Sequence, residues 1–141
     1  MNFRKVNNIT GWAVFLVAML TYMFTREARG SLWDCGEFVA TAYTLGLPHP
    51  PGAPMFTLLG RFFIILFGDN PQTAANAVNF MSAIASAATI LFLFWSITHF
   101  ARKLFGSTEG QLNGRDTFTI MAAGAVGALA YTFSDSFWFS A

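Results

Sequence analysis

The sequence predicts an all-α membrane protein with three transmembrane helices and a long outer loop that contains amphipathic, interfacial helices. Of its 141 residues, 55% are hydrophobic and only 11% are charged, and the mean hydropathy is +0.50. A soluble domain of this size would need more polar surface. The few charges lie between long apolar runs, as they do in the connectors of membrane proteins. The net charge of +1 gives no reason to expect a nucleic-acid partner.

The first predicted span covers residues 8–25, close to the ~20 residues that a helix needs to cross a bilayer. Arg4 and Lys5 precede it, which places the N-terminus in the cytoplasm by the positive-inside rule. The apolar run lacks a clear small-residue cleavage site, so it reads as a retained anchor and not as a signal peptide.

Two further spans are predicted at residues 73–98 and 117–133. Arg102 and Lys103 directly follow the first of these, so its end should be cytoplasmic and the next span should run outward again. A short polar connector with three glycines joins them. Both spans carry small residues four positions apart, such as Gly124 and Ala128, which favours close helix packing over a substrate groove.

Residues 26–71 form the predicted outer loop. It contains a helical apolar pattern over 37–47, then a cluster of prolines that breaks any helix. Residues 55–67 are apolar again, but this run is too short to span and carries Arg61 in its middle. An interfacial or re-entrant helix suits it better. The chain stops at Ala141 without a closing turn, so we expect residues 1–141 to be a single N-terminal fragment of a longer protein.

Asp34 and Glu37 are the first candidate site residues. They lie three positions apart, one helical turn, so both can face the same side. A carboxylate near hydrocarbon is costly and is rarely kept without a partner or a task. One interpretation is a general base whose pKa is tuned by its surroundings. The other is a capping box, in which Asp34 caps the following helix and Glu37 occupies its third position. The two are compatible.

His49 and Arg61 are the second candidates. His49 lies among prolines and could contact a phosphate or move a proton, although an ordinary surface turn is the simpler interpretation. Arg61 could grip a lipid phosphate or only extend its charge to the head groups. The sequence contains no nucleotide or zinc motif. Two carboxylates without further ligands leave a divalent metal cofactor undecided.

Several segments together resemble one family of multi-pass membrane proteins, long catalogued without a function and now grouped with the GT-C glycosyltransferases (family 117), similar to protein O-mannosyltransferases. The resemblance covers essentially the whole chain, and the order and spacing of the motifs make it specific. The segments that carry it are Asn7 to Trp12, Trp33 to Tyr43, His49 to Pro54, Gly60 to Phe63 and Phe137 to Ala141.

The resemblance implies a bacterial inner-membrane (cell-membrane) enzyme with its active face in the periplasm. Such enzymes transfer a sugar from a polyprenyl-phosphate donor to a hydroxyl of a protein or glycan acceptor. By position, the essential acidic residue of their first outer loop maps onto Asp34, with Glu37 close by, and His49 and Arg61 would contact the donor phosphate or lipid. The missing C-terminal part implies that the fragment alone is inactive.

Two rival functions remain. A lipid-carrier transporter subunit would need polar groups at mid-membrane and internal repeats, and the sequence displays neither. A non-catalytic membrane scaffold would need Asp34 only for stability.

Overall fold

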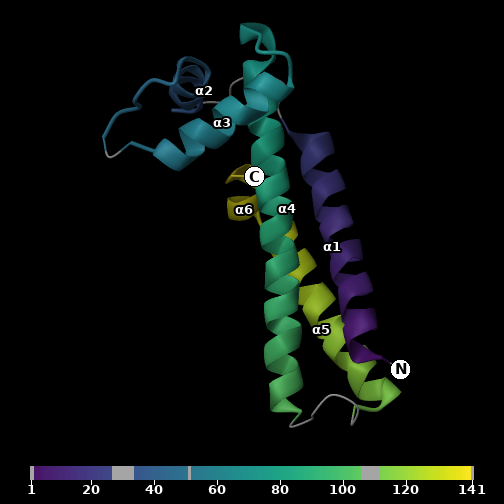
Figure 1. Ribbon diagram of the computed structural model, residues 1–141. Coiled ribbons are helices and arrows are strands. Elements are labelled where there is room, and N and C mark those ends of the chain that lie inside the picture. Colours follow the sequence, from purple (N-terminus) through teal and green to yellow (C-terminus); the bar gives the residue numbers. More distant parts are fainter. Residues whose placement is uncertain (1, 27–33, 51, 106–111, 141) are drawn as a thin grey trace. The chain divides into compact units, whose positions relative to one another are not determined.

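The computed structural model describes residues 2–26, 34–50, 52–105 and 112–140. These ranges contain helices and no strand, so the all-α prediction is confirmed for the described residues. Figure 1 shows the helices in chain order, which are α1 (Phe3–Thr25), α2 (Cys35–Thr44), α3 (Pro54–Leu66), α4 (Pro71–Leu104), α5 (Gly114–Thr132) and α6 (Asp135–Ser140).

Among the described residues, two helices are long and apolar enough to cross a membrane, the 23-residue α1 and the 34-residue α4. They contain the predicted spans 8–25 and 73–98, and both extend beyond them. α4 begins at Pro71, a residue suited to the first helical position because its missing N–H would be unpaired there anyway. α5 is a 19-residue helix in the region of the third predicted span. Its crossing of the membrane, like the arrangement of the outer loop, stays a prediction.

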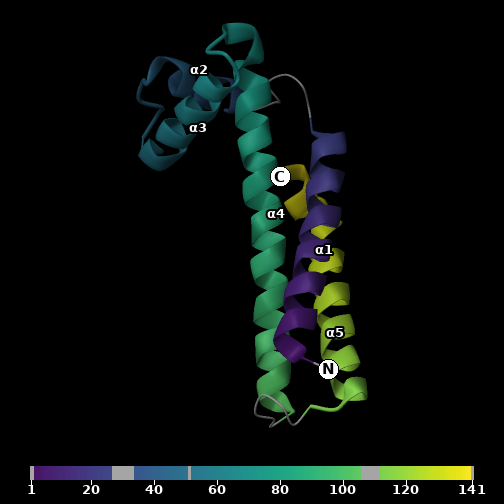
Figure 2. The same cartoon turned by 45° about the vertical axis from the view of Figure 1, so that its right-hand side comes forward.

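One compact unit combines residues 1–24 with residues 85–141. α1 and α5 lie beside this part of α4 in both views of Figures 1 and 2. Glycines permit the close approach: a Cβ on Gly11 would lie 2.6 Å from the Trp95 Nε1 atom, and one on Gly124 would lie 2.6 Å from Thr98 Cγ2. Ala128, one turn after Gly124, is fully buried. The predicted packing through small residues is therefore confirmed for Gly124 and Ala128.

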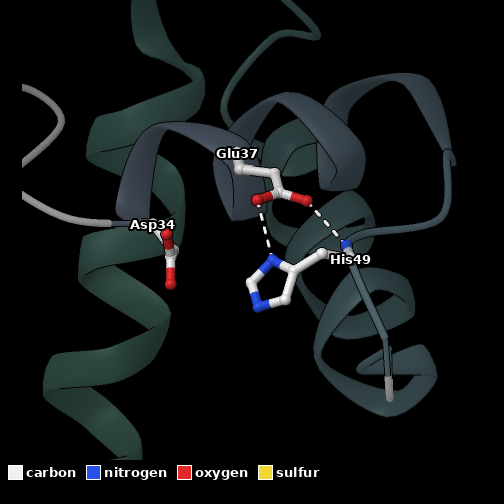
Figure 3. Close-up of side chains that lie close together, drawn as sticks. All are labelled: Asp34, Glu37 and His49. Atoms are coloured by element: carbon white, nitrogen blue, oxygen red, sulfur yellow. Dashed lines mark hydrogen bonds and ion pairs between the residues drawn. The ribbon is translucent and has the colours of Figure 1, made fainter.

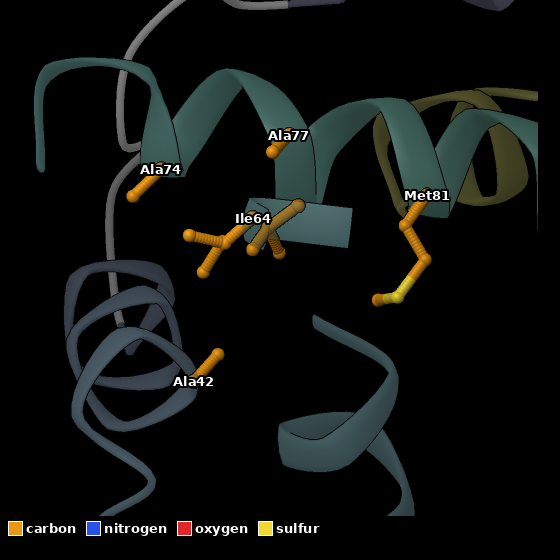
Figure 4. Close-up of a cluster of buried hydrophobic side chains, with 6 residues drawn as sticks. Ala42, Ile64, Ala74, Ala77 and Met81 are labelled. Atoms are coloured by element: carbon orange, nitrogen blue, oxygen red, sulfur yellow. The ribbon is translucent and has the colours of Figure 1, made fainter. Parts of the chain in front are cut away.

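The other compact unit comprises residues 25–84, and it contains all four candidate site residues. Its core takes side chains from α2, α3 and the first turns of α4 (Figure 4). Ile64 is completely buried at the centre, and Gly60 lets α3 approach Ala42 of α2. The buried members of this core are Ala42, Ile64, Ala74, Ala77, Val78 and Met81.

The opposite face of α3 is exposed and apolar. Its large side chains recur at helical spacing, as expected for a helix that contacts a second apolar phase along one side. Each is at least 48% exposed: Met55, Leu58, Leu59, Phe62, Ile65 and Leu66. The helix itself agrees with the predicted run 55–67 to within one residue at each end.

Two left-handed turns end the short helices. α2 stops at Thr44, three residues before the predicted end, because Leu45 adopts φ 54° and the chain turns at Gly46. After α3, Gly68 and Asp69 have φ 96° and 49°. A residue with a Cβ rarely adopts such angles, so the position of Asp69 in this turn is distinctive.

Candidate functional site

The start of α2 places the two candidate carboxylates one turn apart. Asp34 is the residue before the first helical residue, Cys35, and Glu37 lies in the first turn. The chain leaves α2 at Leu45 and returns through Pro48 to His49. Figure 3 shows the result: the side chains of Asp34, Glu37 and His49 gather in one place.

Glu37 and His49 make a two-point contact. The backbone N–H of His49 donates to Glu37 Oε1 at 2.7 Å, and His49 Nδ1 lies 2.9 Å from Glu37 Oε2. An ionised carboxylate only accepts hydrogen bonds, so this geometry requires the proton on Nδ1. The Phe38 ring packs edge-on against the imidazole, with 6.1 Å between ring centroids.

This contact shifts the proton affinity of both residues. The hydrogen bond from the His49 side chain, with a second from its backbone N–H, lowers the pKa of Glu37 below its usual 4.5. The hydrogen bond to Glu37 and the charge of that carboxylate raise the pKa of His49 above its usual 6.5, and Asp34 adds to this. Both side chains are substantially exposed, 39% and 51%. The arrangement therefore favours an ionised Glu37 beside a protonated His49.

The predicted capping box is wrong. Asp34 occupies the position before the helix, but in the described part of the chain its side chain makes no capping hydrogen bond. Glu37 binds His49 instead of reaching back along the helix. His49, in the proline-rich turn that folds back onto α2, takes the place of the helix end as the partner of Glu37, because it supplies two hydrogen-bond donors.

Within the described ranges, the same three residues form a group that could hold a metal ion. One ligand atom from each of Asp34, Glu37 and His49 lies within 4.8 Å of the others, and all three residues are exposed. A mixed set of carboxylate oxygen and imidazole nitrogen suits divalent ions such as Mn²⁺ or Zn²⁺. In the structure, however, Glu37 Oε2 and His49 Nδ1 are hydrogen-bonded to each other, so neither of these two atoms is directed at a metal ion.

Arg61 is held in a separate cluster. Its guanidinium donates to both carboxylate oxygens of Asp69, at 2.6 and 3.0 Å, and to the carbonyl of Tyr43 at 2.9 Å. Its charge also lies 5.5 Å from the centre of the Tyr43 ring. The planar guanidinium suits such two-point recognition of a carboxylate. The structure thus brings Asp34, Glu37 and His49 together and pairs Arg61 with Asp69.

Sequence reasoning missed both of these pairings. The Glu37–His49 contact joins residues 12 apart, and its one sequence signal is the Gly46–Pro48 turn that follows α2. For the contact between Arg61 and Asp69 the sequence indicates less: Gly68 and Asp69, followed by Pro71, predict only that the chain turns there. Trp33 and Pro51, which belong to the motifs named above, lie outside the described residues.

Comparison with known proteins places these residues in a wider context. A family model described as "Protein O-mannosyl-transferase TMEM260 N-terminal domain" matches residues 34–141, so the match begins at Asp34 and includes all four candidates. The mouse protein O-mannosyl-transferase TMEM260 is 33% identical over 109 residues, which is 76% of this chain and 14% of the mouse protein.

A relative named protein O-mannosyl-transferase tmem260 from Dictyostelium discoideum is 30% identical over 84 residues, which is 60% of this chain and 10% of that protein. The chain thus spans only a small part of the length of both relatives. No solved structure matches it. The expected O-mannosyltransferase-like family is confirmed: the chain belongs to the family described as the protein O-mannosyl-transferase TMEM260 N-terminal domain.

Proposed function

We propose that this chain is the N-terminal part of a membrane glycosyltransferase of the GT-C type. It would transfer a sugar, mannose by analogy with the names of its relatives, from a polyprenyl-phosphate donor to a hydroxyl of a protein or glycan acceptor. The observation that carries the proposal is the exposed cluster of Asp34, Glu37 and His49, which lies at the start of the region that matches the family.

We place the site at the outer surface of the inner membrane. α1 and α4 are apolar enough to span, and the cationic residues Arg4, Lys5, Arg102 and Lys103 lie near the ends proposed to be cytoplasmic. Residues 26–71 then lie outside, with the apolar face of α3 on the lipid. A lipid-borne donor enters from the bilayer, so a site beside a surface-lying helix suits it.

The proposed chemistry assigns Asp34 as the general base. Asp34 accepts the proton of the acceptor hydroxyl while that oxygen bonds to the anomeric carbon of the sugar. The bond from this carbon to the phosphate oxygen breaks, and the phosphate leaves with the electron pair. The protonated His49 beside Asp34 supplies positive charge for the departing phosphate. Arg61 could contribute as well, once a donor phosphate replaces Asp69 as its partner.

Asp34 is better suited than Glu37 to the role of general base. The oxygens of Glu37 already accept two hydrogen bonds from His49, and these lower its pKa. A carboxylate with a lowered pKa is a weaker proton acceptor.

The test compares Asp34→Asn with the wild type in the full-length protein. Sugar transfer from polyprenyl-phosphate mannose would be measured in membranes at equal protein level. We expect a loss on the order of 100-fold or more, the usual contribution of a general base. Asp116→Asn, at the start of α5 and outside the cluster, is the matched control and should transfer normally. Undiminished transfer by Asp34→Asn would remove the proposed base and favour a scaffold.

A further inference from the structure

We propose that Glu37 is a positioning residue for His49, which fixes the imidazole so that its Nε2 atom is offered to the reacting groups beside Asp34. This inference rests on the proposed transferase function. It gives the two carboxylates of the motif different tasks, although their spacing in the sequence suggests an equivalent pair.

The hydrogen bonds of Glu37 support this division. Both of its oxygens accept from the same residue, one from the His49 backbone and one from the ring. A single carboxylate thereby fixes the backbone of the turn and the rotation of the side chain together. Figure 3 shows the second ring nitrogen directed away from Glu37, so the contact leaves Nε2 available.

The path of the chain explains why such a restraint is needed. α2 ends at Leu45 in a left-handed conformation, and Gly46 closes the helix by donating its N–H to the Thr41 carbonyl at 2.9 Å. His49 comes three residues after Gly46, and its side chain is 51% exposed. Among the described residues, Glu37 holds the ring of His49 by a hydrogen bond and the edge of Phe38 packs against it. An exposed imidazole without this bond would sample several rotamers.

The charges around His49 define what Glu37 does to it. Asp34 and Glu37, both at the start of α2, are the groups that raise the pKa of His49. α3 packs on α2 and carries Arg61, but that guanidinium faces Asp69 and Tyr43. Removing the charge of Glu37 should therefore lower the pKa of His49, because Asp34 alone remains to favour its protonated form.

A double-mutant cycle separates a positioning role from direct contact with substrate. Glu37→Gln, His49→Gln and the double variant would be compared for transfer in the full-length protein. If Glu37 acts through His49, its replacement should cost about tenfold or more in the wild type. It should then change transfer by no more than about twofold when His49 is already Gln, which is the usual scatter of such cycles.

Losses that multiply in the double variant would refute the inference, because Glu37 would then act independently of His49. Full transfer by His49→Gln would also refute it, since there would be nothing to position. Full transfer by Asp34→Asn is a different outcome, which overturns the proposed function itself.

A second measurement does not need activity. Diethyl pyrocarbonate acylates a histidine only when its imidazole is neutral. The rate at which it modifies His49, measured by peptide mass spectrometry at a series of pH values, therefore follows the protonation of that ring. We expect the midpoint to move to lower pH in Glu37→Gln, with His99 of α4 as the internal reference for the reagent. An unchanged midpoint in a well-folded variant would contradict the Glu37–His49 contact.

Discussion

Replacing Gly60 by alanine tests the close approach of α2 and α3, on which the position of the site depends. A Cβ at Gly60 would lie 2.9 Å from the Cβ of Ala42 and 3.6 Å from Val78 Cγ2. Two carbon atoms prefer a separation of about 3.5–4.0 Å. The Cβ of Ala42 is attached directly to the backbone, so the clash is relieved only if α2 moves away from α3.

Two opposing terms set the expected magnitude. Overpacking in a close-packed core costs ~1–3 kcal/mol, whereas alanine is preferred over glycine inside a helix by about 1 kcal/mol. Gly60→Ala should therefore destabilise the α2–α3 contact by roughly 0–2 kcal/mol, the difference between these terms. Gly36 of α2 is the matched control, because a Cβ there meets nothing within 4 Å. Only the favourable helix term applies to Gly36→Ala.

Hydrogen exchange of the α3 peptide, measured in the full-length protein, reports the free energy of local opening. Because 1.4 kcal/mol corresponds to a factor of ten, we expect protection in Gly60→Ala to fall by up to about 30-fold, and protection of α2 in Gly36→Ala to stay equal or rise. Adding Ala42→Gly removes the opposing Cβ, so the double variant should be more stable than the two single effects predict, by ~1–3 kcal/mol. A coupling energy near zero would show that α2 and α3 do not meet as described.

Two further predictions concern the polar contacts. The hydrogen bond from His49 lowers the pKa of Glu37. The stability that the ionised Glu37 adds through this contact is therefore present above pH 4.5 and is lost as the pH falls through the lowered value. The hydrogen bond to Glu37 raises the pKa of His49. The stability that the protonated His49 adds is therefore present below pH 6.5 and is lost as the pH rises through the raised value. Protection of the His49 amide, corrected for intrinsic exchange, should thus be greatest between these limits; a steady rise with pH would contradict the contact. Arg61→Lys keeps the charge but loses the two-point bond to Asp69, so the turn after α3 should lose about 1 kcal/mol, or fivefold in protection; unchanged protection would mean that this ion pair contributes nothing.

Most helices of the described residues could be predicted from local patterns, but the short α6 (Asp135–Ser140) was not. Apolar length and flanking charges marked α1 and α4, and the apolar run over residues 55–67 marked α3 to within one residue, although Pro54 begins this helix and was expected to break one. The end of α2 was predicted too late because the apolar spacing continues through Leu47. Only the backbone turn at Leu45 ends the helix, and nothing in the periodicity indicates it.

The sequence singled out Asp34, Glu37 and His49 as candidates, but it did not indicate the contact between Glu37 and His49; their roles in a functional site stay a prediction. Asp34 and Glu37 stand out because charge is rare in this chain, and His49 stands out among prolines. Their pairing depends on how the turn after α2 folds back, which a one-dimensional pattern does not contain. The capping box failed for the same reason: a local partner was assigned to Glu37, and a partner 12 residues away supplied better hydrogen bonds.

The ion pair between Arg61 and Asp69 also bears on how the charge of this segment is counted. A positive residue in a short loop is normally taken as a sign of the cytoplasmic side. In the folded protein the guanidinium of Arg61 has as partners the Asp69 carboxylate, eight positions along the chain, and the Tyr43 carbonyl. In the proposed topology Arg61 therefore lies on the outer side as half of a neutral pair and not as a free cation.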